Sequence, residues 1–122
     1  MTLEELYTLI GGNYEQAKQI MNSDRLIDRY VRKLKNSGVE KMLSAAGETM
    51  DPDQLFESAH AMKGVCANLG LEELAAQADA ITEEFRPGNN RKLTDEEVKV
   101  KLLSIAELFE KTLNGIQQYE NS

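Results

Sequence analysis

The side chains best suited to chemistry lie close together in one stretch of the chain, residues 51–70. His60 is the only histidine in the sequence, Lys63 follows it by three residues and Gly64 by four. Residues three and four apart are neighbours on the surface of a helix. If this stretch is helical, an imidazole therefore has an ammonium group beside it, with a gap where Gly64 lacks a side chain.

This arrangement suits a histidine that carries a phosphoryl group. A ring nitrogen of imidazole is a nucleophile and is partly neutral at physiological pH. An ammonium group one turn away stabilises the charge on phosphoryl oxygens. Glycine within a helix costs about 1 kcal/mol relative to alanine, so Gly64 indicates space kept for an incoming group. Taken without further context, however, a lone histidine on a helix is more often structural or merely exposed.

Spacing and motifs argue against several other chemistries. Cys66 lies six residues after His60, about 240° round an ideal helix, so the two side chains diverge. They form neither a shared metal site nor a Cys–His nucleophilic pair within this helix, and we expect no metal site. The chain has no glycine-rich phosphate-binding motif, which argues against a nucleotide site and against autophosphorylation from ATP.

His60 is expected on a helix that has clear capping signals at both ends. Asp51 is a good N-cap, Pro52 suits the first turn, Gln54 stands at the capping-box position and Gly70 suits the end. Apolar residues spaced alternately by four and three predict a seam facing other helices: Leu55, Ala59, Met62, Cys66 and Leu69. A second stripe is expected at the edge of the buried face: Phe56, His60, Lys63, Gly64 and Ala67.

Apolar periodicity predicts further helices over residues 2–10, 14–21, 24–36, 39–48, 71–85 and 95–119, and no stretch alternates like a strand. Tyr30 and Met42 are expected on inward faces, Thr94 and Glu97 as a capping box, and Leu113 as a filler beside Thr112. We therefore predict an all-α fold, an up-down antiparallel four-helix bundle with short additional N-terminal helices. Residues 1–122 form one domain, with the short helices in 1–22 and the bundle in 23–120.

Composition narrows the classes of partner. The net charge of -7 argues against non-specific nucleic-acid binding. No apolar run approaches a membrane span and the acidic N-terminus does not resemble a signal peptide, so we expect no membrane association. A single cysteine favours a reducing compartment, and we expect a cytoplasmic location. A capped bundle with satisfied seams needs no partner to fold, so we expect a monomer.

One helix of this acidic chain carries a cluster of basic residues: Arg25, Arg29, Arg32, Lys33 and Lys35. An ordinary solvated face, partly paired with Asp24 and Asp28, is the simpler interpretation. The alternative is a docking surface for an acidic partner.

The run A-H-A-M-K-G, Ala59 to Gly64, followed by Asn68-Leu69-Gly70, resembles the signature of histidine-containing phosphotransfer (Hpt) domains of multistep phosphorelays. That pattern is roughly A-H-x-L-K-G, then a small or polar residue, an apolar residue and Gly. The likeness covers roughly residues 23–119 and includes the seam after Gly70 and the final amphipathic helix. Met62 replaces the usual leucine, a volume-conserving change.

The resemblance implies the Hpt four-helix bundle, with His60 accepting a phosphoryl group from one receiver-domain aspartate and passing it to another. Lys63 would hold the phosphoryl oxygens and Gly64 would give clearance. The partners implied are response-regulator receiver domains and a hybrid sensor kinase, with this chain as a stand-alone relay module. Mg²⁺ would belong to the receiver, and the chain itself would need no cofactor. By position alone, the candidate docking contacts are Phe56, Ala67, Asn68 and Arg29.

Two further interpretations stay open. A non-catalytic helical interaction module would use the same bundle and the same exposed stripe without any chemistry. Glu57, three residues before His60, would accept a hydrogen bond from the ring and fix its tautomer, although a solvated glutamate is the simpler interpretation.

Overall fold

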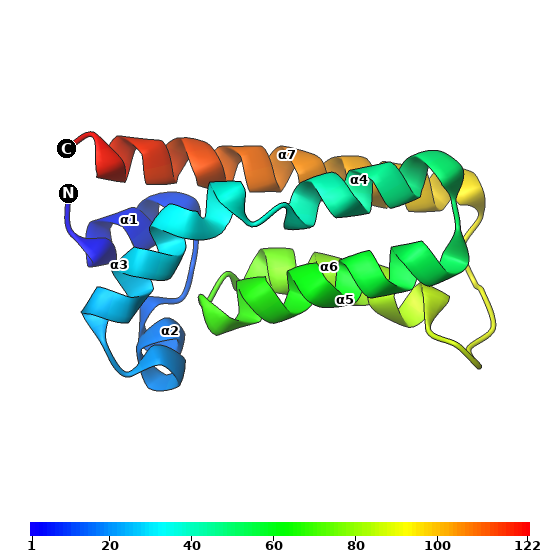
Figure 1. Ribbon diagram of the computed structural model, residues 1–122, viewed down its shortest axis with the longest axis horizontal. Helices are drawn as coiled ribbons and strands as arrows, with labels where there is room; N and C mark the ends of the chain where they lie inside the picture. The colour runs from blue at the N-terminus through cyan, green and yellow to red at the C-terminus, as the bar shows by residue number, and fades with distance from the viewer.

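The computed structural model describes all of residues 1–122 as an all-α molecule, which confirms the predicted fold class. Its helices are α1 (Leu3–Ile10), α2 (Tyr14–Met21), α3 (Asp24–Lys33), α4 (Val39–Thr49), α5 (Pro52–Asn68), α6 (Glu72–Phe85) and α7 (Asp95–Glu120), with a 3-10 turn over Leu34–Asn36. Helices α4 to α7 run side by side in alternating directions, and α1 to α3 gather at the end where both termini lie (Figure 1). None of the helices combines the length and the apolar character needed to cross a membrane.

The ends of α5 and α7 are set by local sequence. Asp51 accepts hydrogen bonds from the backbone N–H groups of Asp53 and Gln54 at the start of α5. Gln54 contributes only its backbone N–H, so the capping box expected there is not formed. Thr94 and Glu97 form the predicted reciprocal capping box at the start of α7. These caps satisfy backbone donors that have no partner within the helix.

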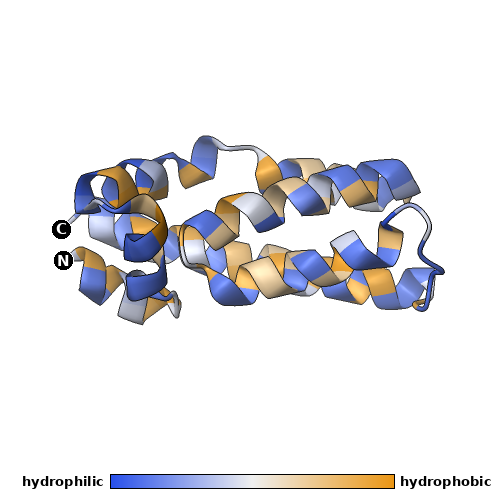
Figure 2. Cartoon of the chain, turned by 90° about the horizontal axis from the view of Figure 1, so that it is seen from below, coloured by the Kyte–Doolittle hydropathy of each residue, from blue (hydrophilic) through white to orange (hydrophobic).

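The core consists of the seams that the periodicity predicts. Each helix carries both hydrophobic and hydrophilic residues (Figure 2). The predicted seam of α5 is buried throughout, as are its counterparts on α6: Leu74, Ala78, Ile81 and Phe85. Burial raises the pKa of the Cys66 thiol to about 12, so Cys66 is a core residue and not a nucleophile.

Two predicted core residues lie at the surface instead. Tyr30 is 45% exposed, because α3 buries Ile27 and Val31, and Tyr30 stands one position off that seam. Met42 is 52% exposed, because α4 follows the spacing Val39, Leu43 and Ala46. A three-residue step and a four-residue step from one buried residue point to different flanks of a helix, and local sequence does not choose between them.

The seam of α7 contains a polar residue. Thr112 is buried, and its hydroxyl donates a hydrogen bond of 2.9 Å to the carbonyl of Leu108. The hydroxyl is thereby satisfied inside its own helix. Leu113, expected to fill the gap, is itself only half-buried, so Thr112 occupies the core position directly.

The N-terminal segment holds the C-terminal end of α5. The buried Tyr7 hydroxyl donates a hydrogen bond of 2.6 Å to the carbonyl of Leu69, and the N–H of Asn13 donates one of 2.8 Å to the carbonyl of Gly70. Gly70 has φ +69°, and a Cβ there would lie 2.2 Å from the carbonyl oxygen of Asn13. Only glycine fits both the backbone angle and the close approach.

Candidate functional site

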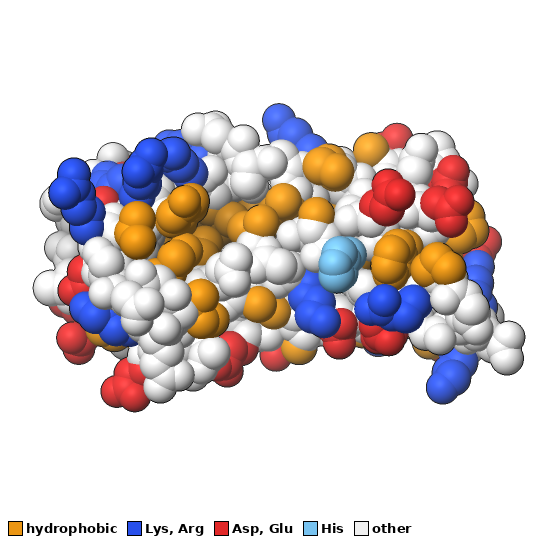
Figure 3. All heavy atoms as spheres, turned by 60° about the horizontal axis from the view of Figure 1, so that its bottom comes forward, with side chains coloured by type: hydrophobic (Ala, Val, Ile, Leu, Met, Phe, Trp, Pro, Cys, Tyr) orange, Lys and Arg blue, Asp and Glu red, His pale blue; other side chains and the backbone are white.

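His60 lies at the surface of α5. Its side chain is exposed, while Ala59 beside it is buried and fixes this face of the helix in the bundle. Figure 3 shows the ring standing among apolar side chains on both sides, with basic side chains next to it. The imidazole stacks on Phe56, with ring centroids 5.8 Å apart and planes inclined by 10°. The ring is therefore oriented by an aromatic neighbour and open to an incoming group.

Gly64 leaves the backbone of α5 uncovered one turn after His60. The residue is exposed, and a Cβ built there would have no atom within 4 Å. No segment of the chain covers this position. The gap expected from the sequence is therefore real space beside the ring.

Lys63 does not extend freely into solvent. Its Nζ lies 2.8 Å from Oδ1 of Asp79, which belongs to α6, and the two side chains are 39% and 41% exposed. The ammonium expected beside His60 is thus held by a carboxylate from the neighbouring helix.

A second ion pair lies further along α6. Arg86 donates two hydrogen bonds, of 2.9 and 2.7 Å, to Oε2 of Glu83. These hydrogen bonds are the main reason that the pKa of the Glu83 carboxyl is below its usual value. The guanidinium also lies 5.3 Å from the centroid of the Phe56 ring, within the range of a cation–π contact. Phe56 therefore lies next to both the imidazole and the Arg86 guanidinium.

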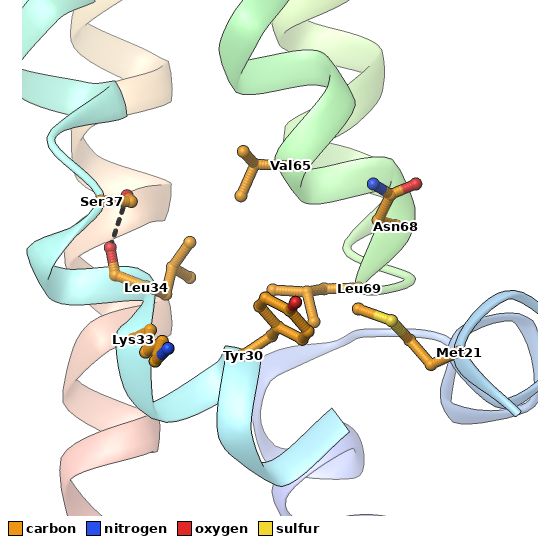
Figure 4. A pocket seen from close by; sticks show the side chains of 8 residues that line it. All are labelled: Met21, Tyr30, Lys33, Leu34, Ser37, Val65, Asn68 and Leu69. Atoms are coloured by element: carbon orange, nitrogen blue, oxygen red, sulfur yellow. Dashed lines mark hydrogen bonds between the residues drawn. The ribbon is translucent and has the colours of Figure 1, made fainter. Parts of the chain in front are cut away.

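A hollow of about 370 Å³ opens near the C-terminal end of α5. Its lining residues come from α2, from the C-terminal half of α3 with the turn that follows, and from the end of α5 (Figure 4): Met21, Tyr30, Lys33, Leu34, Ser37, Val65, Asn68 and Leu69. The Tyr30 side chain, displaced from the core, forms part of this wall. The hollow therefore shares α5 with His60 and presents apolar side chains beside a lysine.

The basic cluster is divided between paired and unpaired residues. Arg32 pairs with Asp28 and Lys35 with Glu120. Arg25, Arg29 and Lys33 are exposed and make no ion pair. Part of the basic face is therefore free to meet a negatively charged partner.

One family model matches most of the chain, including the motif around His60. The family model described as Hpt domain matches residues 15–119 of this chain. The chain belongs to the Hpt domain family. Searches of curated proteins and of solved structures found no significant match. Hpt domains act in histidine phosphotransfer within phosphorelays, as phosphocarriers rather than kinases, and interact with receiver domains and kinases.

The structure of this Hpt domain brings together some of the predicted site residues. Phe56, His60, Lys63 and Gly64 share one face of α5, with Ala67 half-buried further along the helix. Asn68 is exposed and lines the hollow, whereas Arg29 lies on α3 outside its lining. No hydrogen bond joins Glu57 to His60, and Glu57 is exposed. No group of three or more His, Cys, Asp or Glu side chains is placed to hold a metal ion.

The sequence analysis missed Asp79 of α6 and Arg86, the residue directly after α6, which both reach this face of the Hpt domain. Both flank the α6 seam, Asp79 directly after Ala78 and Arg86 directly after Phe85. That position was a usable signal that they lie at the edge of a helix interface. Which α5 residues they meet depends on the register of α5 against α6, which local sequence does not define.

Proposed function

We propose that this Hpt domain relays a phosphoryl group between receiver-domain aspartates through a phosphohistidine at His60. The observation that carries the proposal is the exposed, stacked imidazole beside the uncovered backbone at Gly64. A buried ring or a covered glycine would have barred a receiver from the site. Residues 1–122 have a hydrophobic core of their own, which is what a stand-alone relay module would require.

In the proposed reaction a neutral ring nitrogen of His60 attacks the phosphorus of an aspartyl phosphate. The N–P bond forms as the O–P bond breaks, and the aspartate leaves as a carboxylate. The other ring nitrogen keeps its proton until solvent takes it. Onward transfer reverses these bond changes at a second receiver. Lys63 stabilises charge on the phosphoryl oxygens, and Mg²⁺ is bound at the receiver's own active site, so this chain supplies no cofactor.

We place the docking surface on the face that joins His60 to the hollow. Phe56, Ala67 and Asn68 supply contacts on α5, and Tyr30 supplies an apolar contact on α3. The unpaired Arg29 favours a partner with acidic side chains around its own site. An apolar centre with a charged rim is the usual anatomy of a protein interface.

The test uses two phosphodonors of different size. Phosphoramidate, a small P–N donor that releases ammonia, reports the reactivity of His60 alone, and a purified receiver domain charged with acetyl phosphate reports docking as well. Wild type is expected to gain acid-labile phosphate from both donors, and His60→Gln from neither. Tyr30→Ala and Arg29→Glu are expected to slow labelling by the receiver while leaving labelling by phosphoramidate unchanged.

The outcomes separate a phosphocarrier from a binding module. If His60→Gln labels as well as wild type, the assignment of His60 is wrong. If wild type takes no phosphate from either donor, and wild type and the His60→Gln variant bind the receiver equally well, the chain is an adaptor that works without phosphorylation. The hollow favours this second function, because a partner could bind there without any phosphotransfer.

A further inference from the structure

The contact between Lys63 and Asp79 joins the reactive face of α5 to α6. Lys63 is the only lysine or arginine of α5, and its Nζ meets Oδ1 of Asp79 at 2.8 Å. That oxygen is shielded from water although the Asp79 side chain is 41% exposed, and no hydrogen-bond donor is aligned with it. The Lys63 ammonium is therefore the one group that compensates this oxygen.

The other basic side chain on this flank is already paired with a carboxylate. Facing the site are Asp79 and Glu83 of α6 and, directly after this helix, Arg86, which gives two hydrogen bonds to Glu83. From α5 itself come Lys63 and the exposed Glu57. A phosphoryl group on His60 would bring about two negative charges into this setting. The cation it would draw on is Lys63, which Asp79 already holds.

We propose that Asp79 is a positioning residue for the phosphotransfer reaction, which holds Lys63 against α6 while His60 is unmodified and releases it to the phosphoryl group once His60 is phosphorylated. This inference rests on the proposed function. Because the phosphorylated state must break the Lys63–Asp79 contact, that state is less stable than it would be beside a free lysine. Asp79 thereby keeps the phosphoryl group transferable to the next receiver.

The prediction concerns the charge that the phosphoryl group can hold. In Asp79→Asn the lysine is free to meet the phosphoryl oxygens, so the doubly charged phosphoryl form is favoured. The acid dissociation constant for loss of the last proton from the phosphoryl group on His60 is expected to rise about 2- to 5-fold. That range is the scale of a half-exposed ion pair. Lys63→Gln is expected to lower the same constant. In the Lys63→Gln background, Asp79→Asn is expected to have little further effect, because Asp79 acts through Lys63.

The experiment is a phosphorus NMR titration of the protein phosphorylated with phosphoramidate, with nitrogen NMR of the Lys63 ammonium before and after phosphorylation. The Lys63 signal is expected to move on phosphorylation in wild type. Glu57→Gln is the matched control, because it removes the same charge from an exposed position three residues before His60 without touching an ion pair. Its effect is expected to be smaller than that of Asp79→Asn.

Three results would overturn the role of Asp79: an unchanged dissociation constant in Asp79→Asn, an equal change when Lys63 is already Gln, or an equal change in Glu57→Gln. Each leaves the relay function standing, since His60 is still phosphorylated. If wild type takes up no phosphate at His60 from phosphoramidate or from a charged receiver, the proposed function itself fails, and Asp79 has no phosphorylated state to act on.

Discussion

Replacing Gly64 by alanine is expected to stabilise the fold while it impairs phosphotransfer from a receiver. Gly64 lies within α5, has no positive φ and would present its Cβ to empty space. No steric cost offsets the higher helix propensity of alanine, so the free energy of unfolding should rise by about 0.5–1 kcal/mol. For a domain of this size that corresponds to about 2–5 °C in Tm.

Gly115→Ala is the contrasting variant. Gly115 is also helical, but a Cβ there would lie 2.4 Å from Cγ2 of Ile10, where α1 packs on α7. Ile10 is β-branched and stiff, so α1 must shift, and a loss of about 1–3 kcal/mol is expected. Thermal and denaturant unfolding of the two variants measure this difference directly. A Gly64→Ala variant less stable than wild type would refute the claim that the site is open.

The transfer assay tests what the open space is for. Gly64→Ala is expected to slow labelling by a charged receiver, and Gly64→Gln to slow it further, because the larger side chain fills more of the gap. Labelling by phosphoramidate should change little in either variant, since that donor needs no docked protein. If Gly64→Gln accepts phosphate from the receiver at the wild-type rate, the clearance argument is wrong.

Two further predictions concern stability. Tyr7→Phe removes the hydrogen bond to the Leu69 carbonyl and should cost about 1–2 kcal/mol in chemical denaturation. Because burial raises the pKa of the Tyr7 hydroxyl above its ordinary value of 10.0, its contribution to wild-type stability is complete below that pH and is lost as the pH rises further. Tyr7→Phe should show a shallower alkaline decline. The buried Glu84 carboxylate accepts the backbone N–H groups of Lys92 and Leu93. Glu84→Ala should cost about 1–3 kcal/mol and speed hydrogen exchange at those two amides.

The features that the sequence predicted are those determined within one helix. The cap at Asp51, the capping box of Thr94 and the buried seam of α5 each depend on residues a few positions apart. The exposure of His60 follows from the same reasoning, because the ring stands beside a seam and not in it. The A-H-A-M-K-G motif then identified the family that the comparison confirmed.

The features that the sequence analysis missed depend on how helices meet. The spacing of Tyr30 fits a helical face and predicts a core position, but α3 turns that side chain toward the hollow. The spacing predicts that the Lys63 ammonium lies beside His60, but it does not predict the ion pair of Lys63 with Asp79, sixteen positions later. Such contacts depend on the rotation of one helix against another, which periodicity leaves undefined to within a residue or two.

The family match begins at residue 15. The hydrogen bonds that hold the C-terminal end of α5 come from Tyr7 and Asn13, before that point. Displacement of the first fourteen residues would remove these hydrogen bonds, and with them a support of Leu69, which lines the hollow. A binder that captured α1 would therefore weaken the proposed receiver docking from a distance, without touching the face of α5 that carries His60.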